Sequence, residues 1–207
     1  MIEINNIQDC IQYLDAIDVV LFDLDDTLTN EIDYVKSGYR AVAKEFPQIQ
    51  NCEEKLLKAF KNKLPAIDAV LESEELYSEE NKAKALHAYR FQKPEIEFIS
   101  GAKETLVQLR RQNKKLGIIT DGRPEGQQAK IDALELENLV DKIIITDALG
   151  GTEFRKPNPK AYELMQEFFS VQFQKMAYIG DNIKKDFIAP EKLGMKIVYF
   201  INECGIY

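Results

Sequence analysis

Three aspartates that lie close together are the residues of this sequence most able to do chemistry. Asp23, Asp25 and Asp26 follow the apolar run at residues 19–22, which is typical of a buried parallel strand. Because residues two apart on an extended chain point the same way, Asp23 and Asp25 can face one pocket. Carboxylates at the edge of a core are costly unless a cation or a proton compensates them, so their placement suggests a metal site and a reaction. One carboxylate can attack an electrophile and the other can move a proton, with a hard cation such as Mg²⁺ bridging protein and substrate oxygens.

Further polar clusters follow other apolar runs of the chain. In open α/β sheets, ligands bind outside the carboxyl ends of the strands, so we expect these clusters to converge with Asp23 and Asp25 on one site. The clusters are Thr120-Asp121-Gly122-Arg123, Arg155-Lys156-Pro157, and Gly180-Asp181-Asn182 with Asp186.

The elements that must position these clusters alternate between helix and short apolar run from residue 100 onward. This alternation predicts an α/β fold with a Rossmann-like parallel sheet flanked by helices. The expected strands are residues 18–22, 116–119, 142–145, 176–179 and 196–200, and the expected helices are residues 5–15, 103–113, 125–134, 159–169 and 183–193.

The segment at residues 31–94 has a different character. It is charged and helix-forming throughout, with periodic apolar positions, and it contains no clear strand pattern. We therefore expect an inserted all-helical subdomain of about four helices over residues 31–94, and a core domain made of residues 1–30 and 95–207.

Composition excludes several classes of function. The 207 residues carry a formal net charge of −8, which argues against a nucleic-acid polymer as partner because such binding needs a basic surface. No apolar stretch is long enough to cross a bilayer and the first residues do not resemble a signal peptide, so we expect a cytoplasmic protein without a membrane partner. Cys10, Cys52 and Cys204 are too widely spaced to indicate a disulfide framework or a zinc site. A small phosphorylated metabolite remains a possible partner. We expect the protein to be a monomer or a homodimer.

Together the four polar clusters resemble the motifs of the haloacid dehalogenase superfamily. The segment Asp23–Thr27 matches the first motif, Asp-x-Asp-x-Thr, and Thr120 fits the second. Lys156 fits the third motif, and Gly180-Asp181 with Asp186 fits the fourth. Their order and spacing agree with the family along the whole chain apart from the insertion, whose position matches the family's small mobile helical cap. The resemblance therefore implies a phosphatase-type member, which is an enzyme.

The resemblance also implies catalytic roles. Asp23 would be the nucleophile that forms an aspartyl-phosphate. Asp25 would protonate the leaving alcohol and then deprotonate the attacking water. Thr120 would donate a hydrogen bond to a phosphoryl oxygen, and Lys156 would offset negative charge in the transition state. Asp26 is left with a structural role in the loop.

The same resemblance implies a Mg²⁺ site. The side chains of Asp23 and Asp181 and the backbone carbonyl of Asp25 would coordinate the ion. Asp186 would support that site or act as an occasional ligand. The structural alternative is that Asp181 caps the following helix, which is compatible with a metal role.

Residues beside Thr120 are candidates for substrate binding together with Lys156. Asp121 would bring negative charge close to a phosphate, so we expect it to face away or to be paired. Gly122 belongs to the same loop. Arg123 can reach a substrate carboxylate or hydroxyl, although a surface arginine near a turn is an equal alternative.

The leading hypothesis is a Mg²⁺-dependent phosphatase that acts on a small phosphomonoester. Asp25 favours phosphate chemistry, because family members that cleave carbon–halogen bonds lack the second aspartate of the first motif. We rank phosphorylated sugars or sugar acids above nucleoside monophosphates as substrates. Two alternatives stay open, a phosphosugar mutase and a regulatory module that binds phosphate with little turnover.

Overall fold

The computed structural model describes residues 1–206 of the chain, which divide into two compact units. The first unit contains Met1–Glu31 together with the chain from Glu97 onward. The second unit contains Ile32–Ile96. All the candidate site residues identified from the sequence lie in the first unit.

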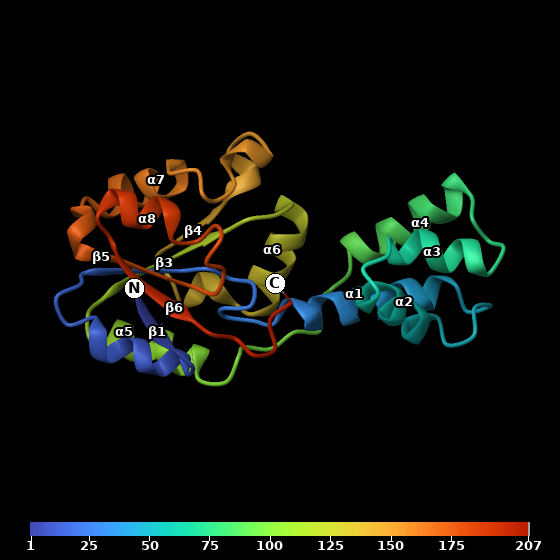
Figure 1. Cartoon of the computed structure of the whole chain (residues 1–207), viewed down its shortest axis with the longest axis horizontal. Helices are drawn as coiled ribbons and strands as arrows, with labels where there is room; N and C mark the ends of the chain where they lie inside the picture. The colour runs from blue at the N-terminus through green and yellow to red at the C-terminus, as the bar shows by residue number, and fades with distance from the viewer. Residues whose placement is uncertain (207) are drawn as a thin grey trace. The chain divides into compact units, whose positions relative to one another are not determined.

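The first unit is built on a parallel sheet of six strands in the order β1-β6-β5-β2-β3-β4 (Figure 1). This confirms the predicted α/β fold class. The sequence pattern did not predict β1, which is a three-residue strand at the edge of the sheet. The strands are β1 (Ile2–Ile4), β2 (Val19–Phe22), β3 (Lys115–Thr120), β4 (Lys142–Ile145), β5 (Met176–Gly180) and β6 (Lys196–Phe200).

Helices flank both faces of this sheet. In Figure 1, α7 and α8 lie on one face, and η1 and α5 lie on the other. Among residues 1–206, no helix combines the length and the apolar character that crossing a membrane requires. The helices are η1 (Ile7–Tyr13), α5 (Ala102–Arg111), α6 (Pro124–Ala133), α7 (Lys160–Phe169) and α8 (Ile188–Leu193), with short 3₁₀ turns η2 (Leu136–Asn138), η3 (Thr146–Leu149), η4 (Thr152–Phe154) and η5 (Phe173–Lys175).

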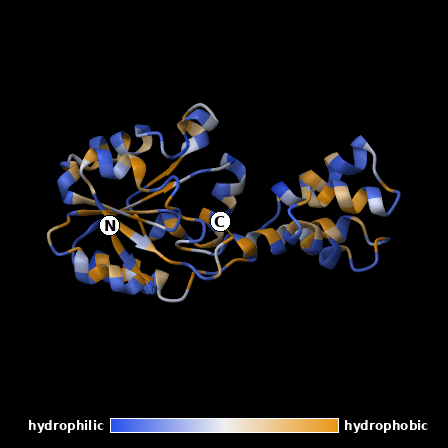
Figure 2. Cartoon of the chain, viewed as in Figure 1, coloured by the Kyte–Doolittle hydropathy of each residue, from blue (hydrophilic) through white to orange (hydrophobic). Residues whose placement is uncertain are grey.

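Strand β2 is the centre of the sheet and explains the apolar run seen in the sequence. All four of its residues are fully buried, since it pairs with β3 on one side and β5 on the other and is covered on both faces. Figure 2 shows apolar, orange residues along the strands in the middle of this unit. The chain runs outward in both directions from β2, so the carboxyl ends of β2, β3 and β5 lie where α/β sheets commonly bind ligands.

Helix α8 differs from its prediction. The sequence favours a helix over residues 183–193, but α8 begins only at Ile188, and Asp186 lies in a turn before it. Pro190 explains the difference, because it has no N–H to donate to the carbonyl of Asp186. That carbonyl instead accepts a hydrogen bond from the Tyr162 hydroxyl at 3.3 Å.

The second unit contains four helices. They are α1 (Glu31–Glu45), whose first residue belongs to the first unit, α2 (Cys52–Lys61), α3 (Ala66–Ser73) and α4 (Glu79–Arg90). Ser78 caps α4 by accepting a hydrogen bond from the backbone N–H of Asn81. The unit has its own core, made of Val35, Tyr39, Val42, Phe46, Ile49, Cys52, Leu56, Ala59, Ala66, Val70, Leu71 and Ala85.

Asp26 holds together the loop that follows β2. Its backbone is left-handed, with φ of 54°, and its side chain is fully buried. The carboxylate accepts hydrogen bonds from the backbone N–H of Glu31 at 2.9 Å and of Ile206 at 3.0 Å. Asn202 donates to the Asp26 carbonyl at 2.9 Å. Asp26 therefore has the structural role expected of it, and it ties the loop to the C-terminal segment.

We expect Asp26→Ala to lower the free energy of unfolding by about 1–3 kcal/mol, because it leaves two partly buried N–H groups without their acceptors and puts alanine at positive φ. Asp26→Asn keeps a side-chain acceptor and tolerates a left-handed backbone, so its loss should be smaller. Urea denaturation of the two variants and the wild type measures this difference. Equal stability of the alanine variant and the wild type would contradict the role assigned to Asp26.

Candidate active site

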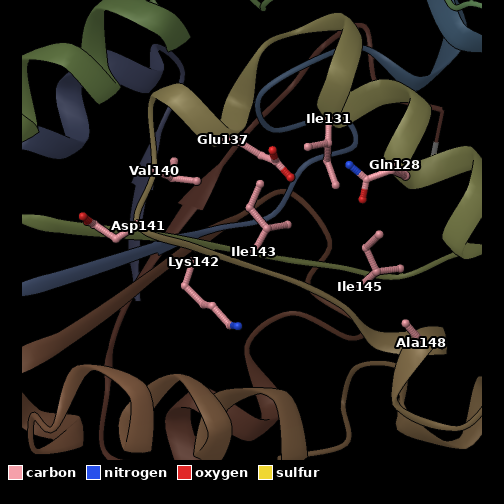
Figure 3. A pocket seen from close by; sticks show the side chains of 9 residues that line it. All are labelled: Gln128, Ile131, Glu137, Val140, Asp141, Lys142, Ile143, Ile145 and Ala148. Carbon is pink, nitrogen blue, oxygen red and sulfur yellow. The ribbon is translucent and has the colours of Figure 1, made fainter.

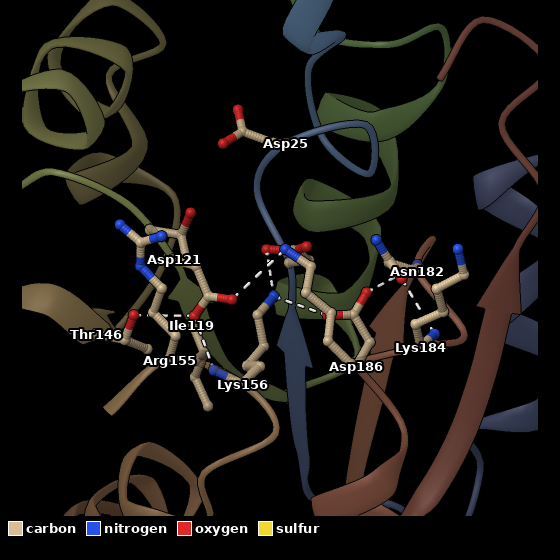
Figure 4. Close-up of polar contacts among 12 residues, drawn as sticks. Asp25, Ile119, Asp121, Thr146, Arg155, Lys156, Asn182, Lys184 and Asp186 are labelled. Carbon is tan, nitrogen blue, oxygen red and sulfur yellow. Dashed lines mark hydrogen bonds and ion pairs between the residues drawn. The ribbon is translucent and has the colours of Figure 1, made fainter. Parts of the chain in front are cut away.

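A buried lysine joins the polar segments at the carboxyl edge of the sheet. The Lys156 ammonium lies 2.8 Å from Oδ1 of Asp23 and 2.8 Å from Oδ1 of Asp186. It also donates a hydrogen bond to the hydroxyl of Tyr178, on β5, at 3.0 Å. Figure 4 shows the Lys156 side chain between Asp121 and Asp186. Segments that are distant in the sequence therefore meet at one ammonium group.

The charge of Lys156 depends on its two acidic neighbours. Burial by itself lowers the pKa of a lysine, because it disfavours the charged form. Here Asp186 and Asp23 outweigh that effect and raise the pKa of Lys156 well above its ordinary value. The side chain is thus a fixed positive charge, and a solvated surface lysine, the ordinary fate of this residue type, is ruled out.

Asp23 is held at the end of β2 by backbone and side-chain contacts. Its N–H donates to the carbonyl of Ile179 at 2.9 Å, which continues the pairing of β2 with β5. Its Oδ1 accepts a hydrogen bond from the N–H of Leu24 at 2.8 Å as well as the contact from Lys156. Both side-chain contacts engage the same oxygen, so Oδ2 is left to face other groups.

Three carboxylates form a cluster that could hold a metal ion. Asp23, Asp181 and Asp186 each offer one oxygen, and these oxygens lie within 4.8 Å of one another. Burial, followed by the charges of Asp23 and Asp186, raises the pKa of Asp181 to about 8. The Thr27 hydroxyl donates to Asp181 at 3.1 Å and partly opposes this shift. Such crowding of negative charge around oxygen donors fits a hard divalent cation.

Most of the candidate residues line one cavity of about 320 Å³ in the first unit. Thr120 is fully buried beside it, and Asp186 is fully buried against Lys156. Arg123 is exposed on the loop before α6 and lies outside this cavity. The residues that line the cavity are Asp23, Asp25, Glu31, Asp121, Gly122, Arg155, Lys156, Asp181, Asn182 and Lys185.

Asp121 is paired, which was one of the two outcomes expected for it. Its Oδ1 accepts hydrogen bonds from the Thr146 hydroxyl at 2.9 Å and from the backbone N–H of Lys156 at 3.0 Å (Figure 4). Its Oδ2 lies 3.5 Å from the ammonium of Lys185. Asp121 therefore connects the loops after β3, β4 and β5.

Two cations that the sequence motifs did not identify, Lys185 and Arg155, also line this cavity. Lys185 comes directly before Asp186, and nearby carboxylates, led by Asp23, raise its pKa although burial lowers it. Arg155 comes directly before Lys156 and makes two hydrogen bonds of 2.7 Å to the carboxylate of Asp147. The sequence signal that could have identified these two cations was their position directly beside the motif residues Asp186 and Lys156. A cavity with several cations and several carboxylates suits an anionic ligand bound together with a metal ion.

A second group that the sequence analysis did not identify lies around Asp25. Lys130 and Gln127, both on α6, contact the two oxygens of its carboxylate. In Figure 4 the Asp25 carboxylate lies apart from the contacts of Lys156. The available signal was that α6 has polar residues at positions where a helix on a sheet would carry an apolar stripe.

Another cavity of about 480 Å³ lies beside β4 (Figure 3). Ile131, Val140, Ile143 and Ile145 form much of its wall, with Glu137, Asp141 and Lys142 among the remaining residues. Asp141 accepts a hydrogen bond from the backbone N–H of Leu116 and is thereby part of the sheet's support. The cavity that contains Asp23 and Lys156 is therefore the better candidate for chemistry, although it is the smaller of the two.

Comparison with known proteins identifies the family of this arrangement. The model of the haloacid dehalogenase-like hydrolase family matches residues 20–200. The chain is 30% identical to a glyceraldehyde 3-phosphate phosphatase of Pyrococcus abyssi, over 89% of this chain and 81% of that protein, and 29% identical to its counterpart in Pyrococcus furiosus, over 89% and 80%. Among solved structures, the magnesium-bound hydrolase YfnB of Bacillus subtilis shares the fold with a TM-score of 0.65 and 17% identity, over 88% of this chain and 86% of that one. The chain belongs to the haloacid dehalogenase-like hydrolase family.

Proposed function

We propose that this protein is a Mg²⁺-dependent phosphatase that hydrolyses a small phosphomonoester through an aspartyl-phosphate intermediate. The observation that carries the proposal is the Lys156 ammonium held between Asp23 and Asp186 at the wall of a cavity that Asp25 also lines. Membership of the hydrolase family and curated relatives named as phosphatases support it.

In the first half-reaction, Oδ2 of Asp23 attacks the phosphorus, since Oδ1 is engaged by Leu24 and Lys156. The bond between phosphorus and the leaving oxygen breaks, and Asp25 gives its proton to that oxygen, so an alcohol departs. Lys156 offsets the negative charge that gathers on the nucleophile and on the phosphoryl oxygens. Thr120 supplies a hydroxyl donor to one of these oxygens.

In the second half-reaction, Asp25 takes a proton from a water molecule, and the resulting hydroxide attacks the phosphorus. The bond between phosphorus and Asp23 breaks, which releases inorganic phosphate and regenerates the carboxylate. The sum of the two steps is one phosphomonoester and one water converted to one alcohol and one phosphate. Asp25 thus returns to the state in which it began the cycle.

The carboxylates of Asp23, Asp181 and Asp186 and the carbonyl of Asp25 are the groups that would hold Mg²⁺. The chemistry that a bound Mg²⁺ would supply there is neutralisation of charge on the phosphoryl oxygens. The raised pKa of Asp181 supports this assignment, because burial and the neighbouring carboxylates both disfavour its charged form and a bound cation would offset both effects. Asp186 shares its carboxylate with Lys156 and the N–H of Asn182, so it would mainly orient the cluster.

The helical segment at residues 31–94 would act as a cap that shapes substrate choice. Its insertion point supports this role, since the chain leaves the core after the loop that carries Asp25 and returns before β3. Lids of this kind exclude water and select substrates. The names of the relatives in Pyrococcus specify glyceraldehyde 3-phosphate. Those names and the proposed cap favour small phosphorylated sugars or sugar acids as substrates.

Asp23→Asn tests the nucleophile. We expect hydrolysis of an aryl phosphate with Mg²⁺ to fall by roughly 10³-fold or more, because an amide cannot form the acyl phosphate. Asp15→Asn, which changes an exposed carboxylate far from the cavity, is the matched control and should retain full turnover. Undiminished turnover in the Asp23 variant would remove that residue as the nucleophile.

Asp181 makes the stability of the metal-free protein depend on pH. Its folded pKa of about 8 is above the ordinary value of 3.8, so the folded state binds the proton more tightly than the unfolded state. The stability that this group contributes is present below about pH 4 and is lost as the pH rises to about 8. In EDTA, we expect the Tm of the wild type to fall across this window more than that of Asp181→Asn, with each kcal/mol worth roughly 2–4 °C.

Added Mg²⁺ should raise the Tm of the wild type at pH 8 and leave that of Asp181→Asn nearly unchanged, because binding to the folded state stabilises it. Asp15→Asn is again the control for a simple loss of charge. If the Tm of the wild type and the Tm of Asp181→Asn change identically with pH in EDTA, the raised pKa assigned to Asp181 is refuted.

A phosphate-release screen over a panel of metabolites, with and without Mg²⁺, tests the substrate class. We expect phosphorylated sugars and sugar acids to be hydrolysed faster than nucleoside monophosphates. Hydrolysis of nucleotides alone would overturn this ranking, and an isomerised sugar phosphate without free phosphate would indicate a mutase. Tight binding of a phosphate analogue without any hydrolysis would indicate a regulatory module.

A further inference from the structure

Helix α6 buries two polar side chains where a helix on a sheet ordinarily buries apolar ones. Gln127 and Lys130 are only 4% and 2% exposed. They are three positions apart, so they lie on the same face of the helix. A buried ammonium is costly unless a carboxylate compensates it, which requires a reason for Lys130 to be there.

Both side chains hold the carboxylate of Asp25. The Lys130 ammonium lies 2.6 Å from Oδ1 of Asp25, and the Gln127 amide donates to Oδ2 at 2.9 Å. The same amide nitrogen of Gln127 also contacts the hydroxyl oxygen of Thr120. Because each oxygen of Asp25 has its own donor, the plane of the carboxylate is fixed at two points.

Gly122 allows this approach. Its φ is 140°, and a Cβ at this position would lie 3.1 Å from Cγ of Gln127. A larger residue would therefore be strained in its own backbone and would also press on the side chain that contacts Asp25. The loop after β3 and the first turns of α6 fit together around the Gln127 amide.

We propose that Gln127 and Lys130 are positioning residues that hold the Asp25 carboxylate in place for proton transfer at the leaving oxygen of the substrate. The inference rests on the proposed function, in which Asp25 is the acid and base. Asp25 sits on a loop, and proton transfer needs a donor whose oxygen is kept within hydrogen-bond reach. A carboxylate has about four acceptor positions, so the two contacts from α6 leave positions for other groups, and Asp25 lines the cavity.

The test compares two substrates that differ in how much their leaving group needs a proton. We measure kcat/KM, which covers the steps up to departure of the leaving group, with an alkyl phosphate and with p-nitrophenyl phosphate. For Lys130→Met we expect a loss of about 10–100-fold with the alkyl phosphate, which is part of the roughly 10²–10⁴-fold that general acid catalysis contributes. The loss with p-nitrophenyl phosphate should be much smaller. Gln127→Met should show the same pattern, and Lys130→Arg should restore part of the loss.

Gln128→Met is the matched control, because Gln128 is an exposed neighbour on the same helix and should leave both substrates unaffected. Lys130→Met is also combined with Asp25→Asn. If Lys130 acts through Asp25, the double variant should be little worse than Asp25→Asn alone with the alkyl phosphate.

Equal losses with both substrates, or additive losses in the double variant, would overturn the proposal in favour of a purely structural role. If Lys130→Met does not fold, Gln127→Met decides, and failure of both to fold also overturns it. An Asp25→Asn variant with normal kcat/KM on the alkyl phosphate would instead refute the acid role of Asp25 in the proposed function. The two failures are therefore distinguishable.

Discussion

The contact of the Lys156 ammonium with Asp23 and Asp186 is the interaction on which the rest of the site depends. An isolated ammonium buried in this position would lose much of its hydration energy, and the two carboxylates without it would repel each other. Each group is tolerable only because the others are present. The contact therefore fixes the relative positions of the loops that follow β2, β4 and β5, and it places a permanent positive charge beside Asp23.

The charges of this site are arranged in two groups. The Lys156 ammonium contacts the carboxylate of Asp23. Lys130 and Gln127, both on α6, contact the carboxylate of Asp25. In the proposed chemistry these two aspartates do different work, one forming a bond to phosphorus and the other moving a proton. Separate partners allow each carboxylate to be held in the geometry that its own task requires.

The site carries more negative charge than its lysines compensate. The pKa of Asp181 is raised to about 8, mainly by burial and by its acidic neighbours, and burial also raises the pKa of Asp26. Folding that concentrates carboxylates in this way costs free energy, which a bound divalent cation can offset. The acidic loops thus connect metal binding with the stability of the core unit, and the hydrogen bonds to Asp26 keep the first of these loops in place.

The sequence by itself determined the α/β class, the positions of five of the six strands, and the segments that carry Asp23, Lys156 and Asp181. It could do so because buried strands and strand-end loops leave local patterns of apolar and polar residues. Only the tertiary structure decided which side chains meet, since contacts such as Lys130 with Asp25 join positions 105 residues apart. It also decided that Arg123 lies outside the cavity, because helical periodicity cannot show which way an exposed side chain turns.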